Sequence, residues 1–380
     1  MANNDLTKRI YLDYNATSPL RDLARTAIMD AHAFPLNASS VHAYGRMGRK
    51  IIEDTRAHLS RAINCPAAQI TFNSGATEGN NTVINHFAQT YPKETILIGA
   101  TEHPSIHDLP CANIKTIPTD HNGVVNLDAL ENMLGAEPRT SLVSVMMANN
   151  ETGTLQPLKD ITTLAHSKGA LIHCDATQGL GRIHIDMQAL GIDLMTVSSH
   201  KIGGPQGVGA LAVGLCGVSP ILLHGGGQEK KQRAGTENVA GIAGFGAAIT
   251  QACDADILTH EQQRLEGLRT HLEKAITDTC PEAVIHAQTA ARIPNSTLIS
   301  IPGAKAESML MAFDLDGIAI SNGSACSSGT VKASHVLNAM GTEKNLAKGT
   351  LRISTGWQTT QGDIDAFIQS FTKILQRIQK

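Results

Sequence analysis

Residues 196–207 read Thr-Val-Ser-Ser-His-Lys-Ile-Gly-Gly-Pro-Gln-Gly and directly follow two apolar residues, Leu194 and Met195. The apolar run over residues 194–197 predicts a strand. The Gly-Gly-Pro segment predicts a turn that neither a helix nor a central strand can continue. Lys201 therefore lies where the backbone breaks at the end of a core element. Because small ligands bind beyond the strand ends of open α/β sheets, this stretch predicts a binding site beside Lys201.

Two roles fit a lysine at this position. Lys201 is either a solvated loop residue or an amine with a lowered pKa that forms a Schiff base with an aldehyde cofactor. Pyridoxal 5'-phosphate is such a cofactor. It also needs a cradle for its phosphate, an acid for its ring nitrogen and a group over its ring face. The second role therefore predicts three further features elsewhere in the chain.

The composition is that of a globular protein without a strongly charged partner. Of the 380 residues, 42% are hydrophobic and 17% are charged, and the net charge is −3. This balance gives no reason to expect nucleic acid or a membrane surface as a partner. No apolar run approaches the roughly 18 residues of a transmembrane helix. The length makes two domains the expectation.

The N-terminus and the cysteines bear on cellular location. Residues 1–5 contain neither a basic region nor an apolar run, so we expect no signal peptide. The seven cysteines are scattered and include no Cys-x-x-Cys pair, which argues against a disulfide framework and a zinc site. We therefore expect a cytoplasmic protein with reduced thiols and no metal.

Short apolar runs alternate with helical patterns along the first two thirds of the chain. The predicted strands are residues 70–72, 95–98, 141–147, 170–174, 194–197 and 209–213. The predicted helices cover residues 21–33, a long pattern through 51–62, 75–89, a short one near 105, and 158–168. This alternation predicts an α/β fold with a mostly parallel sheet covered on both faces.

The last third of the chain has a different pattern. A long helical run covers residues 237–279, followed by short strands at 296–301, 318–321 and 351–354 and helices near 307, 336 and 365. We predict a large α/β domain of residues 15–254. Residues 1–14 and 255–380 are predicted to form a smaller α+β domain.

Two features match the needs of the phosphate and the ring nitrogen. Ala76 and Thr77 begin a predicted helix after a strand, and a helix N-terminus offers free N–H groups to an anion. Asp175 ends an apolar strand, where a carboxylate is costly unless a protonated partner such as a pyridinium N–H accompanies it. An ordinary capped helix and an N-cap aspartate are the alternative interpretations.

Three more polar residues have a functional and a structural interpretation. His103 follows a predicted strand, so it could lie over a planar ring and move protons, or be purely structural. Asn150 also follows a strand and could reach a ring oxygen or a carboxylate, or belong to a turn. Arg352 lies in a short strand, suited to a bidentate hold on a carboxylate or to a structural ion pair.

Cys326 lies in a run of small residues, 321–330, that has little to bury. We expect an exposed thiol on a flexible segment. The other six cysteines mostly occur in apolar or helical contexts and are expected to be inert.

Nine motifs in this order resemble those of the cysteine desulfurases, over nearly the whole chain. They are Tyr11–Thr17, Ser74–Glu78, Thr101–His103, Asn149–Glu151, Asp175–Gln178, Ser198–Lys201, Arg233–Asn238, Gly323–Cys326 and Leu351–Arg352. The resemblance implies the fold of type I pyridoxal-phosphate-dependent transferases and a homodimer with active sites at the subunit interface. It also implies release of sulfur from L-cysteine, leaving L-alanine. The serine-rich segment around Cys326 resembles the subgroup that serves iron–sulfur cluster assembly or nitrogen fixation.

The resemblance also implies roles for individual residues. Lys201 would form the Schiff base, Asp175 would hold the ring nitrogen and His103 would stack on the ring. The residues implied for the rest of the cofactor are Ala76, Thr77, Ser198 and His200 at the phosphate, Thr236 from the other subunit, and Asn150 and Gln178 near the ring oxygen. Arg352, with Asn150, would hold the substrate carboxylate. Cys326 would be the nucleophile that takes the sulfur and delivers it to an acceptor protein such as an iron–sulfur scaffold.

One departure and three alternatives remain. Gly204 and Gln206 stand where the family leads us to expect a large polar or aromatic residue and a basic one, so the flexibility and surface charge of that loop, and with them the sulfur acceptor, are in doubt. A selenocysteine lyase and an aminotransferase share the fold, although an aminotransferase has no use for Cys326. A non-catalytic subunit that only binds partners is disfavoured by intact Lys201, Asp175 and Cys326.

Overall fold

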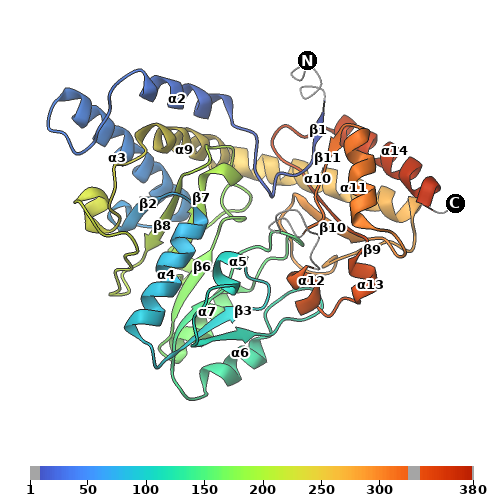
Figure 1. Ribbon diagram of the computed structural model, residues 1–380, viewed down its shortest axis with the longest axis horizontal. Coiled ribbons are helices and arrows are strands. Elements are labelled where there is room, and N and C mark those ends of the chain that lie inside the picture. The colour runs from blue at the N-terminus through green and yellow to red at the C-terminus, as the bar shows by residue number, and fades with distance from the viewer. Residues whose placement is uncertain (1–8, 324–333, 379–380) are drawn as a thin grey trace.

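A seven-stranded sheet forms the centre of the larger part of the protein (Figure 1). The computed structural model describes residues 9–323 and 334–378. The sheet comprises β2 (Ile70–Asn73), β3 (Thr95–Gly99), β4 (Ile114–Ile117), β5 (Thr140–Ser144), β6 (Leu171–Asp175), β7 (Leu194–Ser198) and β8 (Gly209–Val213). Their order is β2-β8-β7-β6-β5-β3-β4, and every pair is parallel except the two that involve β8. The predicted mostly parallel sheet is confirmed.

Helices cover both faces of this sheet, which explains its apolar strands. One core lies between the sheet and the helices α3 (Ala43–Ile63), α6 (Leu127–Leu134), α7 (Leu158–Ser167) and α9 (Val239–Ala252). The other lies between the sheet and α4 (Ala76–Thr90). Successive strand residues alternate between the two cores: Leu97 belongs to the first, and Ile96 and Ile98 to the second.

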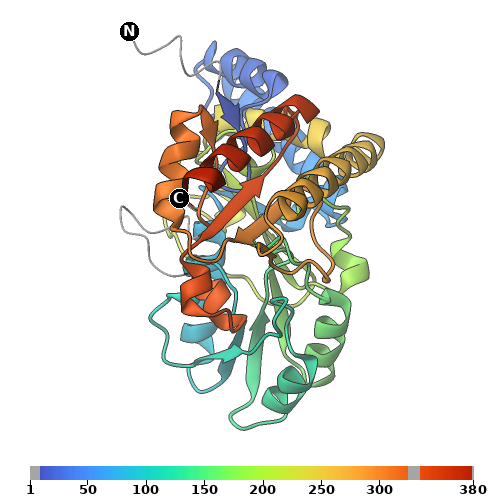
Figure 2. The same cartoon turned by 90° about the vertical axis from the view of Figure 1, so that its right-hand side faces the viewer.

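The last third of the chain has its own sheet and core. Strands β9 (Val284–Ile285), β10 (Ser296–Ser300) and β12 (Thr350–Ser354) pair antiparallel, with β10 in the middle. Helices α10 (Ala255–Thr279), α11 (Ala306–Leu315) and α14 (Gln361–Ile378) pack on them, and Figure 2 shows α14 lying beside α10. This core includes Leu12 from the N-terminus and a stacked Phe313–Phe367 pair with ring centroids 4.9 Å apart. The last third of the chain thus has a core of its own, while the division into two domains and their boundaries stay a prediction.

Several elements differ from the prediction. The long helix expected over residues 237–279 is two helices, α9 and α10. They separate at Asp254, whose carboxylate accepts hydrogen bonds from the N–H groups of Asp256 and Ile257, both at 3.2 Å, and so begins α10. Strand β4 was missed because Lys115 and Thr116 are exposed at the edge of the sheet, which removes the apolar signal.

Short elements complete the chain. They are β1 (Ile10–Tyr11), α2 (Asp22–His32), α5 (Pro104–His107), α8 (Met187–Leu190), β11 (Ile318–Ala319), α12 (His335–Ala339), α13 (Lys344–Ala347) and the single 3-10 turns η1 (Ala67–Gln69), η2 (Ser199–Lys201) and η3 (Gln228–Lys231). Across residues 9–323 and 334–378, no helix is long and apolar enough to cross a membrane.

Residues 13–18 connect the smaller core to the end of the large sheet. The N–H of Tyr14 donates to the carbonyl of Ser354 in β12 at 3.2 Å. Four residues later, the N–H of Ser18 donates to the carbonyl of His200 at 2.9 Å, and its hydroxyl to that of Lys201 at 2.8 Å. This crossing segment, residues 13–18, therefore lies against the turn that carries Lys201.

Candidate active site

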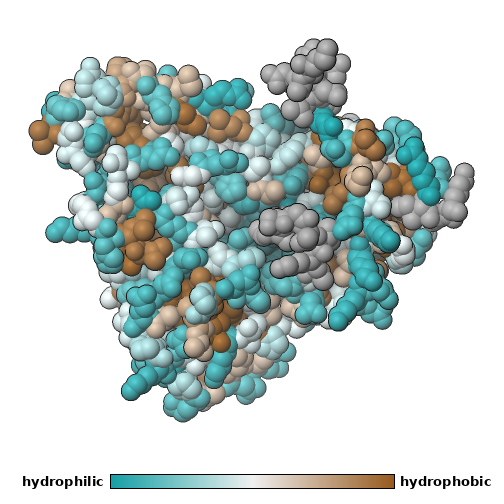
Figure 3. Space-filling model, viewed as in Figure 1, coloured by the Kyte–Doolittle hydropathy of each residue, from teal (hydrophilic) through white to brown (hydrophobic). Residues whose placement is uncertain are grey.

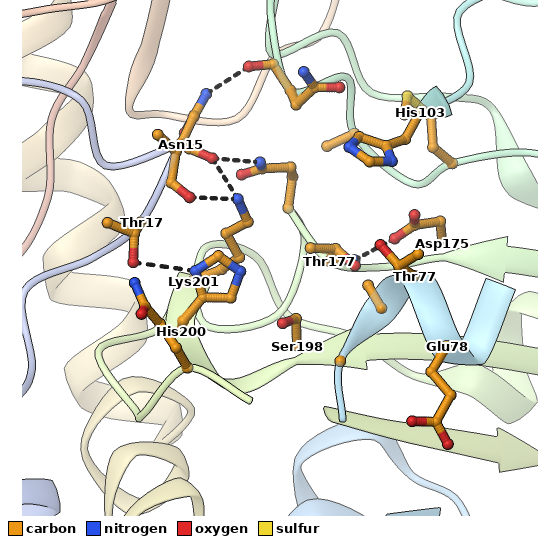
Figure 4. A pocket seen from close by; sticks show the side chains of 18 of the residues that line it. Asn15, Thr17, Thr77, Glu78, His103, Asp175, Thr177, Ser198, His200 and Lys201 are labelled. Carbon is orange, nitrogen blue, oxygen red and sulfur yellow. Dashed lines mark hydrogen bonds between the residues drawn. The ribbon is translucent and has the colours of Figure 1, made fainter. Parts of the chain in front are cut away.

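A cavity of about 550 Å³ opens at the carboxyl ends of β6 and β7 (Figure 4). Ten of the twelve predicted site residues line it: Ala76, Thr77, His103, Asn150, Asp175, Gln178, Ser198, His200, Lys201 and Arg352. They come from the ends of four strands, β3, β5, β6 and β7, from the start of α4 and, for Arg352, from the middle of β12. Several parallel strands ending at one edge of a sheet bring the first of these groups together.

The other two predicted residues are not part of this cavity. Thr236 is exposed and lines a separate hollow of about 180 Å³ with Gly235 and Asn238. That position leaves its predicted role at the partner's phosphate a prediction. Cys326 lies outside the described residues.

Lys201 ends the 3-10 turn η2 that follows β7. Its Nζ donates to the carbonyl oxygens of Asn15 and Ala16, both at 2.7 Å. The two acceptors belong to the crossing segment, so the N-terminus of the chain positions the amine at the cavity wall.

The glycine at position 204 has a local steric cause. A Cβ atom there would lie 2.1 Å from the Oγ of Ser199 and 3.1 Å from its carbonyl oxygen. A larger residue therefore requires Ser199 to move. Gln206 is exposed and lines the cavity, so the second departure changes its rim.

Asp175 ends β6 and is 5% exposed. Its Oδ1 accepts the backbone N–H of Thr177 at 2.9 Å, and its Oδ2 accepts the amide Nδ2 of Asn80 at 2.7 Å. These two hydrogen bonds, one to each carboxylate oxygen, fix the orientation of the side chain.

His103 begins α5, and its Nδ1 accepts the backbone N–H of Ser105 at 3.1 Å. Burial lowers the pKa of His103 below its ordinary value, and the charge of Lys201 lowers it further, against the opposite influence of Asp175. The ring is therefore neutral over more of the physiological range, with Nδ1 unprotonated.

The start of α4 forms a cradle of backbone N–H groups. Gly75 precedes Ala76 with a φ of +147°, a conformation that favours glycine, and a Cβ atom at Gly209 would lie 2.6 Å from the Cα of Gly75. Glycines at both positions permit this close approach. Beside them, burial lowers the pKa of His200 to about 4, and its Nδ1 lies 3.1 Å from the hydroxyl of Thr17.

Glu78 puts a negative charge next to this cradle, but it is paired. Its carboxylate receives the Arg233 Nε at 3.0 Å and the Ser74 N–H at 2.9 Å. Although burial acts in the opposite direction, these hydrogen bonds lower the pKa of Glu78. Arg233 thus offsets a charge that would otherwise repel an anion.

Arg352 lies in β12 and is 1% exposed. Its Nη2 donates to the Oδ1 of Asp13 at 2.7 Å and its Nη1 to the carbonyl of Asn150 at 2.9 Å. Its Nε is buried without a hydrogen-bond partner among the described residues. Arg352 therefore forms a structural ion pair and also lines the cavity. Its guanidinium keeps N–H groups that can bind a carboxylate.

These residues fit pyridoxal phosphate. An amine, a buried carboxylate, a neutral imidazole and a helix N-terminus line one cavity, whose volume is in the range of cofactor sites.

The sequence analysis included Asn15 in a motif but assigned no role to Asn15 or to Asn80. The carbonyl of Asn15 accepts both Lys201 Nζ at 2.7 Å and Gln178 Nε2 at 3.0 Å. Asn80 is fully buried and bound to Asp175. The available signal was an asparagine among apolar residues, Asn80 in α4 and Asn15 in the crossing segment, because a buried amide needs hydrogen-bond partners.

Burial weakens the described cysteines as nucleophiles. It raises the pKa of all six thiols that the described ranges contain, to about 11 for Cys65 and about 12 for Cys253, and well above the ordinary value for Cys174. Because a thiolate is the reactive form, these six are poor candidates for sulfur chemistry.

Known proteins resemble this chain over almost its full length. A family model described as aminotransferase class-V matches residues 10–367. The cysteine desulfurase IscS of Dictyoglomus turgidum is 35% identical over 384 residues, covering 98% of this chain and 96% of that protein.

Solved structures agree with this likeness. A NifS-like protein from Rickettsia africae matches with a TM-score of 0.89 and 39% identity, covering 97% of this chain and 99% of that one. SspA in complex with cysteine matches with a TM-score of 0.78 and 26% identity, covering 91% and 99%. All residues that line the cavity lie within the range matched by the family model.

Proposed function

The chain belongs to the aminotransferase class-V family, and we propose that it is a pyridoxal-phosphate-dependent cysteine desulfurase. It converts L-cysteine to L-alanine and transfers the sulfur onward. The observation that carries this proposal is that Lys201, Asp175 and Arg352, from three separate elements, line one cavity.

The residues that line the cavity have different roles in this reaction. Pyridoxal phosphate, when bound, supplies an electron sink for charge that develops on the substrate. Asp175 holds a proton on the ring nitrogen, and the start of α4 with Ser198 and His200 holds the phosphate. Arg352 binds the substrate carboxylate, and the Nζ of Lys201 moves the proton of the substrate α-carbon. Imidazole at His103 covers the ring and can exchange a proton.

Cys326 is the proposed sulfur acceptor, from the sequence alone. Its thiolate sulfur bonds to the sulfur of the substrate, and the Cβ–S bond of the substrate breaks. The electron pair of that bond stays on the carbon fragment, which takes up a proton and leaves as alanine. The products balance: L-cysteine and a thiol give L-alanine and a persulfide. The raised pKa values of the six described cysteines support this choice.

We also propose a homodimer with shared sites. Apolar side chains are exposed on α2, on the first turn of α3 and on the loop between them: Met29 at 65%, Phe34 at 44%, Val41 at 86% and Tyr44 at 47%. Brown areas lie over this part of the molecule at the upper left of Figure 3. A second copy would bury them. Thr236 would reach the partner's cofactor phosphate, the role that its motif implies. The persulfide would then pass to an acceptor such as an iron–sulfur scaffold, and a cytoplasmic location stays the prediction of the sequence.

The test is an assay of the purified protein with L-cysteine and a reductant. We expect alanine and sulfide in equal amounts, together with an absorbance band of bound cofactor. Keto acid in place of alanine would indicate an aminotransferase, and turnover of L-selenocysteine with none of L-cysteine would indicate a selenocysteine lyase. Absence of any product would leave the non-catalytic subunit. Each of these three results contradicts the proposal.

A further inference from the structure

We propose that Asn80 is a positioning residue whose single amide orients both Asp175 and, through Ser105, His103. The inference deepens the proposed function, because it concerns the two side chains that would hold the cofactor ring. Asn80 lies in α4, one turn after Ala76, and is 0% exposed. It does not line the cavity itself, so its influence must act through its neighbours.

The first contact is with Asp175. The amide Nδ2 of Asn80 donates to Oδ2 at 2.7 Å, while the Thr177 N–H donates to Oδ1 at 2.9 Å. Each carboxylate oxygen thus receives one donor, which prevents rotation about the Cβ–Cγ bond. Of the two donors, only the Asn80 amide belongs to a side chain and can be removed by substitution.

The second contact leads to His103. The same Nδ2 donates to the hydroxyl oxygen of Ser105 at 2.9 Å, and that hydroxyl lies 2.9 Å from Nδ1 of His103. Because the Ser105 oxygen accepts from Asn80, its own hydrogen is available to donate to Nδ1. The backbone N–H of Ser105 donates to Nδ1 as well, at 3.1 Å. Both donors favour the ring with its proton on Nε2.

The charge of Asp175 determines how the Asn80 amide lies. An NH₂ group facing a carboxylate is attracted, whereas the amide oxygen in that place would be repelled. The amide oxygen then lies on the other side, buried without a hydrogen-bond partner among the described residues. An unsatisfied buried oxygen is unfavourable, and it is accepted here with the two donors directed at Asp175 and Ser105.

The test compares apoproteins, so it does not depend on turnover. The variants Asn80→Ala and Asn80→Leu both remove the donors, but leucine largely restores the volume. We expect both variants to bind pyridoxal phosphate more weakly, with a dissociation constant raised by about tenfold, roughly 1.4 kcal/mol. If Asn80 only filled space, the leucine variant would bind pyridoxal phosphate as tightly as the unmodified protein does. That result would overturn the proposal.

Asn85→Ala is the matched control. Asn85 lies on the same helix, but its amide donates to the backbone carbonyl of Asn81 and contacts neither Asp175 nor Ser105. We expect its cofactor affinity to stay within about twofold of the unmodified protein. An equal loss in this control would mean that the effect comes from α4 as a whole and would contradict a specific role of Asn80.

A further variant, Ser105→Ala, keeps the hydrogen bond between Asn80 and Asp175. It removes only the hydroxyl that joins Asn80 to His103. Loss of the hydroxyl donor should raise the titration midpoint of His103, followed by NMR of isotope-labelled histidine in the apoprotein. The charged groups around His103 are Asp175, Lys201, His335 and Asp108, and this variant alters none of them. An unchanged midpoint would overturn the His103 part, even if the Asn80 variants failed to fold.

The outcomes for Asn80 and for the proposed function are separable. If the unmodified protein binds pyridoxal phosphate but makes no alanine, the desulfurase assignment fails while the comparison of Asn80 and Asn85 variants still stands. If it turns over L-cysteine and the Asn80 variants bind the cofactor normally, only the inference about Asn80 fails.

Discussion

The carboxylate of Asp13 holds the guanidinium of Arg352 across 339 residues of sequence, with 2.7 Å between Oδ1 and Nη2. Arg352 is almost fully buried, so its orientation depends on this partner and on the Asn150 carbonyl. One cationic side chain of the cavity is thus oriented by a residue that lies outside it.

Asp13→Asn should impair substrate binding more than cofactor binding. Loss of the charged partner lets Arg352 reorient, and we expect the KM for L-cysteine to rise by about tenfold, roughly 1.4 kcal/mol, with little change in pyridoxal phosphate affinity. Asp314→Asn, which removes the exposed ion pair with Arg9, is the control and should leave KM unchanged. Equal effects of the two variants would contradict the role of Asp13.

Lys201→Ala should abolish alanine formation and the absorbance band of the cofactor bound through this lysine. The backbone of the turn is held by the Ser199 carbonyl, which accepts from the N–H groups of Ile202 and Gly204 at 3.1 Å each. The fold should therefore persist, as measured by circular dichroism. Alanine production at the full rate would disprove the assignment of Lys201.

Asp175→Ala should weaken cofactor retention and lower kcat by far more than tenfold. Without the carboxylate, nothing on this strand end keeps a proton on the ring nitrogen. Dialysis against cofactor-free buffer and a steady-state assay measure the two effects. A loss below about tenfold, or 1.4 kcal/mol of barrier, would argue against this role.

Cys326→Ser should bind L-cysteine, visible as a spectral shift, and yet make little alanine. In the unmodified protein, brief exposure to L-cysteine should add one sulfur atom to the peptide that contains Cys326, and a reductant should remove it. Mass spectrometry of the digest makes the comparison. Finding the labile sulfur on Cys111, Cys216 or Cys253, the described cysteines that are partly exposed, would contradict the mechanism.

Lys231→Gly should stabilise the protein. Glu229, Lys230 and Lys231 have φ values of 44°, 56° and 67°, the left-handed region that costs a non-glycine residue about 1–2 kcal/mol. Glycine removes this strain at one position, but it also raises the conformational entropy of the unfolded chain, which offsets part of the benefit. We expect the free energy of unfolding to rise by about 0.5–1 kcal/mol, measured as a higher Tm.

The same substitution at the exposed Lys373 provides the control for Lys231. Lys373 lies inside α14, where glycine should destabilise by about 1 kcal/mol. A lower Tm for both variants would show that the left-handed turn is not strained.

The sequence predicted the strand ends of the site well because the signal is local. An apolar run followed by a polar residue marks Asp175 and Lys201 in any parallel sheet. The roles of Asn15 and Asn80 depend on which segments fold against them, and no local pattern encodes that. Thr236 remains open for a related reason, since its predicted ligand belongs to a second copy of the chain.

The bonds of the crossing segment have a consequence for biosynthesis. The acceptors of Lys201 and the partner of Arg352 are made before the strands of the large sheet, whereas Arg352 follows 339 residues after Asp13. A nascent chain can complete the large sheet before Arg352 is added to the cavity wall. A chain truncated before Arg352 would therefore leave Asp13 without its cation.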